Sequence, residues 1–109
     1  MKTKEALKKK GALQKRASLF AALGDATRLT LILELAQGKP QSIAQLDVGS
    51  PLTRQAITKH LHVLQERGVV NSTYAGRENL FELNPQPFEN VQEYLKDVGE
   101  QWENALKRL

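Results

Sequence analysis

Apolar residues recur at helical spacing near the start of the chain. Between Lys4 and Leu23 they fall at steps of three and four, which predicts one amphipathic helix. Gly24 interrupts this pattern, and Asp25 is a favourable N-cap for a second helix that stops at Gly38. The residues expected to face the core are Leu13, Ala17, Phe20 and Leu23 in the first helix, and Leu29, Ile32, Leu33 and Ala36 in the second.

The middle of the chain predicts a short helix, a turn and a longer helix. Ser42 can cap the short helix, and residues 47–51 contain the Gly-Ser-Pro sequence of a turn. Thr53 can cap the longer helix, and Gly68 is typical of the position just after a helix C-cap. The longer helix has two faces. Ile57, Leu61 and Leu64 are expected in the core, whereas Gln55, Thr58, Lys59 and His62 form a polar stripe turned away from it, with Arg54 at the leading edge.

A β-hairpin is predicted after this helix. Residues 69–74 carry the β-prone types Val, Thr and Tyr, and residues 79–83 are largely apolar. Between them, residues 75–78 contain the glycine of a tight tip. Helix, turn, helix and hairpin in this order are typical of a winged helix-turn-helix domain, so the predicted fold is mainly α with a small β-hairpin.

The last helix, predicted for residues 87–109, has the most regular apolar spacing in the chain. Steps of three and four alternate along it, which is the heptad pattern of a helix packed along another helix. The partner can be a second subunit or the first helix of the same chain, and different parts of the helix can serve both. Trp102 can fill such an interface or line a ligand cleft. The heptad positions are Phe88, Val91, Leu95, Val98, Trp102, Ala105 and Leu109.

Composition narrows the class of protein. The 109 residues, 40% of them hydrophobic, suit a single globular domain spanning residues 1–109. No apolar run is long enough for a membrane span, and the basic amino terminus lacks the apolar stretch of a signal peptide, so we expect a soluble cytoplasmic protein without a membrane partner. The chain has no cysteine, and its two histidines point in different directions on one helix. No metal site and no cofactor are expected.

Positive charge is concentrated at the amino terminus. Residues 1–16 hold seven lysines or arginines against one acid, in a chain whose net charge is +4. A basic arm suits a polyanion such as nucleic acid. A solvated helix face is the alternative for the arm taken alone.

The polar stripe on the longer helix has the residue types that read DNA. An α-helix fits the major groove, where Arg can bind guanine, Gln can bind adenine, and Thr can donate a hydrogen bond or contact a methyl group. Lys59 can serve a phosphate instead. Three functions compete with DNA binding: an enzyme, for which no phosphate loop, nucleophile elbow or metal-ligand pair is present, a winged-helix module for protein partners, and a winged-helix RNA binder.

At these residues the sequence resembles the arsenic-repressor-type (ArsR/SmtB-like) winged-helix regulators. Residues 19–33 (LFAALGDATRLTLIL) resemble the family's entry into its second helix, although Ala26 stands where proline is usual. Residues 52–64 (LTRQAITKHLHVL) resemble its recognition helix. The residues at 68–70 and 76–78 match the entry and the tip of its wing.

The resemblance implies a homodimeric repressor that binds double-stranded DNA, with recognition helices in successive major grooves. The expected segments are a basic first helix (1–23), the helix-turn-helix (42–68), the wing (69–84) and a dimerisation helix (87–109). His60 is expected to be structural. The residues expected at DNA are Arg54, Gln55, Thr58, Lys59 and His62, with Arg77 of the wing at the backbone or minor groove. Those expected in the dimer interface, formed by the first and last helices, are Leu13, Phe20, Val91, Leu95, Val98, Trp102 and Leu109.

Two departures from the family pattern are visible. The third helix, Ser42 to Asp47, lacks the cysteines of the metal sensors, and the last helix has no histidine, so the resemblance is to a cysteine-free branch that does not sense metal. Gly49, Ser50 and Pro51 replace the usual small and aliphatic residues before the recognition helix, which suggests an unusual angle between the two helices. A small-molecule effector of unknown identity is left open.

Overall fold

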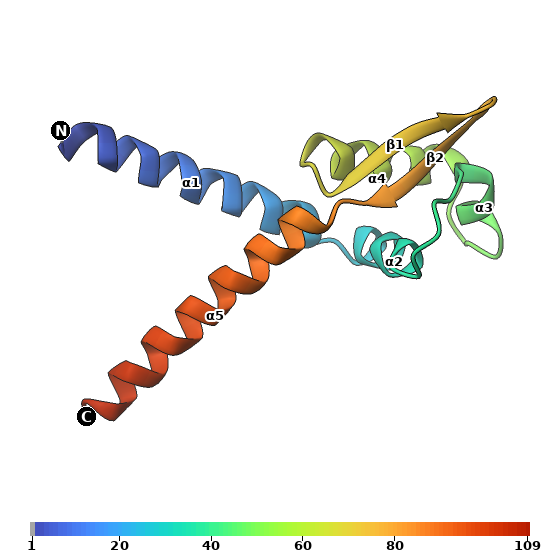
Figure 1. The fold of residues 1–109 in the computed structure, drawn as a ribbon. Coiled ribbons are helices and arrows are strands. Elements are labelled where there is room, and N and C mark those ends of the chain that lie inside the picture. The colour runs from blue at the N-terminus through green and yellow to red at the C-terminus, as the bar shows by residue number, and fades with distance from the viewer. Residues whose placement is uncertain (1) are drawn as a thin grey trace.

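The computed structural model describes residues 2–109, and its order of elements is the one the sequence predicts (Figure 1). The wing begins one residue later than expected, and the last helix begins two residues earlier and ends before Leu109. The elements are α1 (Lys2–Leu23), α2 (Ala26–Leu35), α3 (Ile43–Asp47), α4 (Arg54–Glu66), β1 (Val70–Ala75), β2 (Glu78–Leu83) and α5 (Pro85–Lys107).

Side chains cap the helices at the positions that the sequence indicates. The carboxylate of Asp25 accepts from the Arg28 amide at the start of α2, and the hydroxyl of Thr53 accepts from the Ala56 amide at the start of α4. Ser42 forms a reciprocal capping box with Gln45, which allows α3 to be only one and a half turns long. These caps satisfy amides that a helix start leaves without partners. They fix where each helix begins.

Gly68 ends α4 in the left-handed conformation, with φ of +74°. Its amide donates to the carbonyl of Gln65, and the amide of Val69 donates to the carbonyl of Leu64, which is the Schellman arrangement. Leu64 and Val69 are fully buried, so the same turn that ends the helix packs the entry to the wing against it.

The wing is a two-stranded antiparallel hairpin in which Ala75 pairs with Glu78. The two residues between them are Gly76, with φ of +65°, and Arg77, whose φ is not positive. A positive φ at the first of two loop residues is the type II′ turn, whose twist matches that of the strands. An isolated bridge between Gln41 and Phe81 joins the segment before α3 to β2.

The core lies between α2, α4, the hairpin and the base of α1. Its buried residues are Ala22, Leu31, Ile32, Leu35, Leu46, Ile57, Leu61, Leu64, Val69, Val70 and Phe81. The expectation for α4 is confirmed. For α2 it is wrong except at Ile32, because Leu31 and Leu35 are buried, whereas Leu29, Leu33 and Ala36 are exposed.

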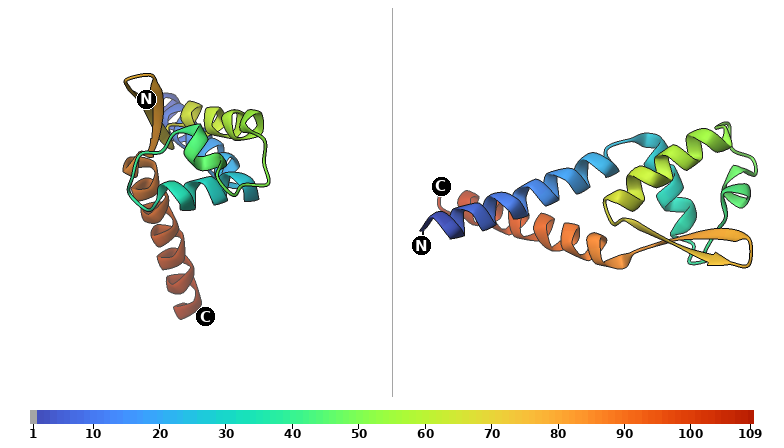
Figure 2. Two further views of the ribbon diagram at one scale, coloured as in Figure 1. Left: turned by 90° about the vertical axis from the view of Figure 1, so that its right-hand side faces the viewer. Right: turned by 90° about the horizontal axis from the view of Figure 1, so that it is seen from above.

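Helices α1 and α5 extend from this core on the side opposite the wing tip (Figures 1 and 2). They meet near their bases, where the rings of Phe20 and Tyr94 are 5.9 Å apart edge to face and Arg16 lies 4.7 Å from the centre of the Tyr94 ring. Leu13 and Ala17, placed on the core face by the sequence, are exposed farther out. Helix α5 has no buried residue, and within residues 2–109 no helix is apolar enough over a sufficient length to span a membrane.

Candidate nucleic-acid interface

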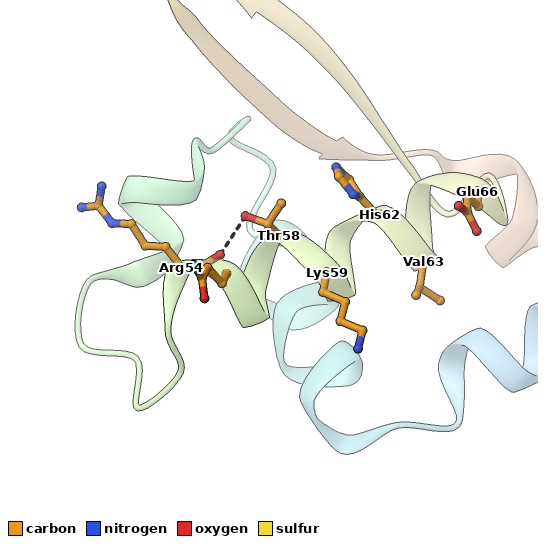
Figure 3. A pocket seen from close by; sticks show the side chains of 7 residues that line it. Arg54, Thr58, Lys59, His62, Val63 and Glu66 are labelled. Carbon is orange, nitrogen blue, oxygen red and sulfur yellow. Dashed lines mark hydrogen bonds between the residues drawn. The ribbon is translucent and has the colours of Figure 1, made fainter.

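Helix α4 presents one face to the core and the other to solvent (Figure 3). Ile57, Leu61 and Leu64 have no exposed surface at all. On the opposite side, Arg54, Gln55, Lys59 and His62 are exposed and Thr58 is half-buried. The structure therefore brings the five predicted residues of α4 onto one face, where four of them are exposed. With Val63 and Glu66, they line a shallow surface hollow along the helix: Arg54, Gln55, Thr58, Lys59, His62, Val63 and Glu66.

At the start of this face, Arg54 is held by an acidic partner. Its Nε donates to Oδ2 of Asp47 over 2.9 Å, across the turn between α3 and α4. The Arg54 side chain is 65% exposed, so the contact restrains it without burying it. The first turn of α4 has no acidic residue of its own, and Asp47 supplies the negative charge there.

Thr58 and His62 follow along the face. The hydroxyl of Thr58 donates to the carbonyl of Arg54 over 2.7 Å (Figure 3). This bond uses the only hydroxyl proton, so Thr58 offers an accepting oxygen and a methyl group to any partner. In Figure 3, the ring of His62 points toward the hairpin side and Lys59 points to the other side of the helix axis. The polar stripe therefore presents side chains on both sides of the α4 axis.

Arg77 is exposed at the tip of the wing, apart from α4. The tight turn at Gly76 places Arg77 at the tip. Glycine suits this position because the left-handed φ there is strained for residues with a Cβ. On the helix side, the side-chain Nε2 of Gln65 donates to the Ser72 hydroxyl over 2.9 Å, which links α4 to the first strand. The basic side chains of α4 and Arg77 of the wing are therefore two separate positively charged sites on one folded domain.

His60 lies off this face and contacts the scaffold, as expected. Its Nδ1 is 3.9 Å from Oδ2 of Asp25. The pKa of the Asp25 carboxyl is lowered from its ordinary value, first by the hydrogen bond from the Arg28 amide and also by the electrostatic effect of the nearby Arg28 and His60 side chains. Arg28 continues this junction by donating to the carbonyls of Ala22 and Ala21 at the end of α1. These contacts fix the junction of α1 and α2 beside α4.

The residues expected in a dimer interface lie mainly on an uncovered face of this chain. Val91 and Phe20 are half-buried, whereas Leu13, Leu95, Val98 and Trp102 are exposed, Trp102 by 64%. Leu109 is fully exposed and lies beyond the last helical residue, Lys107. The heptad positions from Leu95 to Leu109 are therefore exposed to solvent in this chain.

Sequence reasoning missed two residues that organise the site. Asp47 is seven residues from Arg54 and lies across a turn, so no helical spacing rule pairs them. Arg28 lies within residues 19–33, which resemble the family's entry into its second helix, but no spacing rule pairs it with the end of α1. Within residues 2–109, no group of three or more His, Cys, Asp or Glu side chains is placed to hold a metal ion.

Comparison with known proteins agrees with this geometry, although no family profile matches the chain. The chain is 34% identical over 80 residues to the HTH-type transcriptional regulator YuzN of Bacillus subtilis (strain 168), covering 68% of this chain and 87% of that protein. An ArsR-like transcriptional regulator from Rhodococcus sp. RHA1 has a similar structure, with a TM-score of 0.79, 36% identity and coverage of 88% of this chain and 90% of that one.

A more distant structure supports the fold alone. The homodimeric winged helix-turn-helix DNA-binding domain of Mb0332 from Mycobacterium bovis superposes with a TM-score of 0.69 at 18% identity, over 85% of each chain. The winged helix-turn-helix fold is therefore confirmed, and the relatives are transcriptional regulators rather than enzymes. The chain belongs to the ArsR-like family of helix-turn-helix transcriptional regulators.

Proposed function

We propose that this protein is a repressor that binds double-stranded DNA as a homodimer. One observation carries the proposal: the polar face of α4 is accessible along its length while the opposite face is fully buried. A helix held in this way can enter the major groove without rearrangement of the domain. In the proposal, Arg54, Gln55, Thr58, Lys59 and His62 meet base edges and nearby phosphates, and Arg77 meets the backbone or minor groove.

The shape of the chain supports self-association. The radius of gyration is 17.6 Å, compared with about 13 Å for a compact chain of this length. The accessible surface is 8431 Å², compared with about 6,100 Å² for a folded monomer of 12.2 kDa. An excess of roughly 2,300 Å² on each protomer matches the area of a permanent dimer interface. Because α1 and α5 project from the core and carry exposed apolar side chains, we assign the interface to Leu13, Phe20, Val91, Leu95, Val98, Trp102 and Leu109.

A two-fold dimer makes a specific prediction about the DNA site. Two copies of α4 related by a two-fold axis would read an inverted repeat with half-sites about one helical turn, ~34 Å, apart. Selection of bound sequences from random duplex DNA, followed by footprinting, tests this. Recovery of an inverted repeat supports the proposal. If the intact dimer selects no sequence from the random pool, the proposal is overturned. A protein partner would then be favoured instead.

Salt dependence provides a second test. Lysines and arginines that neutralise phosphates release condensed counterions, so affinity should fall steeply between low and physiological salt. A flat response would contradict duplex binding by this face.

Such a protein would work in the cytoplasm, beside the chromosome. Release by a small-molecule effector stays a hypothesis, to be tested by screening metabolites for an increase in Tm that is accompanied by loss of DNA binding.

A further inference from the structure

Asp47 and Arg54 are joined across the turn of the helix-turn-helix. Asp47 is the last residue of α3 and Arg54 is the first residue of α4. The bond runs from the inner guanidinium nitrogen, Nε, to Oδ2 of the carboxylate over 2.9 Å. The Asp47 side chain is 29% exposed, less than half the exposure of Arg54. The carboxylate is therefore the better fixed member, and the arginine is the member that reaches outward.

The bond leaves the outer edge of the guanidinium free. Among residues 2–109, Nη1 and Nη2 of Arg54 have no hydrogen-bond partner. In Figure 3 they stand at the tip of a side chain that extends away from α4. A guanidinium is a rigid plane with five N–H donors, so holding Nε fixes the orientation of the plane. The two outer nitrogens can then bind O6 and N7 of guanine together.

We propose that Asp47 is a positioning residue that presents Arg54 to a guanine. The inference rests on the proposed DNA-binding function and adds a specificity-determining residue to it. Stability does not account for the contact, because an exposed ion pair contributes little to folding. Orientation of Arg54 accounts for the contact instead, because a long side chain that is already ordered loses less rotamer freedom on binding.

The position of the carboxylate makes two effects of its removal separable. A negative charge beside the face of α4 repels phosphates, so removing it should raise affinity for duplex DNA of any sequence. The same removal frees the arginine and should lower discrimination at the base pair that Arg54 reads. A residue that only stabilises the turn would weaken binding to all sequences alike. Opposite signs on the two measurements identify the positioning role.

The test uses the full chain and the sequence selected by the wild-type protein. Binding is measured to that site, to each single base-pair variant and to random duplex. Arg54→Ala identifies the base pair whose discrimination depends on Arg54. Asp47→Ala is then compared with Glu66→Ala, which removes a carboxylate from the last residue of α4. The Glu66 carboxylate makes no hydrogen bond or ion pair with the side chains described in residues 2–109. Melting temperatures establish that each variant is folded.

We expect Asp47→Ala to reduce discrimination about tenfold, equivalent to about 1.4 kcal/mol, at the Arg54 base pair alone. Glu66→Ala should keep the wild-type discrimination, and both variants should bind random duplex at least as tightly as the wild type. In an Arg54→Ala background, Asp47→Ala should have no further effect on discrimination. Unchanged discrimination, or a loss spread evenly over all positions, would overturn the inference. If the wild type selects no sequence, the proposed function fails instead.

Discussion

Asp25 serves two helices at once, because its carboxylate caps α2 through the Arg28 amide at 3.0 Å and faces His60 of α4 at 3.9 Å. This contact fixes the orientation of α4, and so of its polar face, relative to the junction of α1 and α2. Arg28 reinforces the same point by donating to the last carbonyls of α1. The Gly-Asp-Ala-Thr-Arg sequence, residues 24–28, is a joint between three helices.

This joint predicts a pH-dependent contribution to stability from Asp25. The pKa of its carboxyl is lowered in the folded protein, mainly by the hydrogen bond from the Arg28 amide, so the unfolded state binds the proton more tightly. The contribution is therefore complete at neutral pH and is lost as the pH falls below about 4. Asp25→Ala should lower the Tm by several degrees at pH 7, and the difference from wild type should shrink at pH 3.5.

Asp25→Asn is the matched variant. Its side-chain oxygen still caps the helix, so it should retain more of the stability than alanine does. All comparisons need one protein concentration, because a dimer's Tm depends on concentration. Equal Tm values for Asp25→Ala and wild type at pH 7 would contradict the role of the joint.

Local signals in the sequence were sufficient to predict the order of elements. Asp25, Ser42 and Thr53 act through bonds to residues three positions away, and Gly68 acts within a single turn. Such features depend on a few neighbouring residues and can be read without knowledge of the tertiary structure. The starts of α2, α3 and α4 and the end of α4 followed from them.

The buried face of α2 could not be predicted in the same way. Residues 29–36 are apolar at every position except Thr30 and Glu34, so helical periodicity does not select one face. Packing against α4 and β2 selects Leu31 and Leu35 and leaves Leu29 and Leu33 outside. The pair of Asp47 and Arg54 was missed for a related reason, since it joins two helices whose relative placement depends on the turn.

Arg54 is expected to discriminate between sequences. If its guanidinium binds a guanine, Arg54→Ala should cost about 1–3 kcal/mol at the selected site and less on random duplex. Fluorescence anisotropy with both duplexes measures the difference. Arg108→Ala, an exposed arginine at the far end of α5, removes the same charge away from the site and should leave the ratio of the two affinities unchanged. An equal loss on both duplexes would make Arg54 a phosphate contact.

Arg77 is expected to act on all sequences alike. Its position at the wing tip suits a phosphate, so Arg77→Ala should weaken the selected site and random duplex equally and should reduce the salt slope by about 1. Arg77→Lys keeps the charge and should preserve most of the binding. A lysine variant as weak as the alanine variant would instead indicate insertion of the guanidinium into the minor groove.

The exposed heptad face of α5 predicts that one buried charge will separate the protomers. Val98 is 46% exposed in this chain and lies at the middle of the face, so a dimer seam would enclose it. Val98→Asp would place a carboxylate in that seam without a partner, a change that costs more than an interface of this kind can tolerate. Sedimentation should show a monomer at concentrations where the wild type is a dimer. Asn104→Asp adds the same charge on the opposite side of α5 and should remain dimeric.

The same pair of variants connects assembly to DNA binding. The core contains no buried residue from α5, so Val98→Asp should keep the helix-turn-helix folded and its helical circular dichroism nearly unchanged. Each protomer would then bind a half-site alone and lose the effective concentration that links two half-sites, which amounts to a factor of about 10² or more in affinity for the full inverted repeat. Binding to a single half-site should change little. A Val98→Asp protein that remains dimeric would place the interface elsewhere, and the exposed Leu29 and Leu33 of α2 would be the next surface to test.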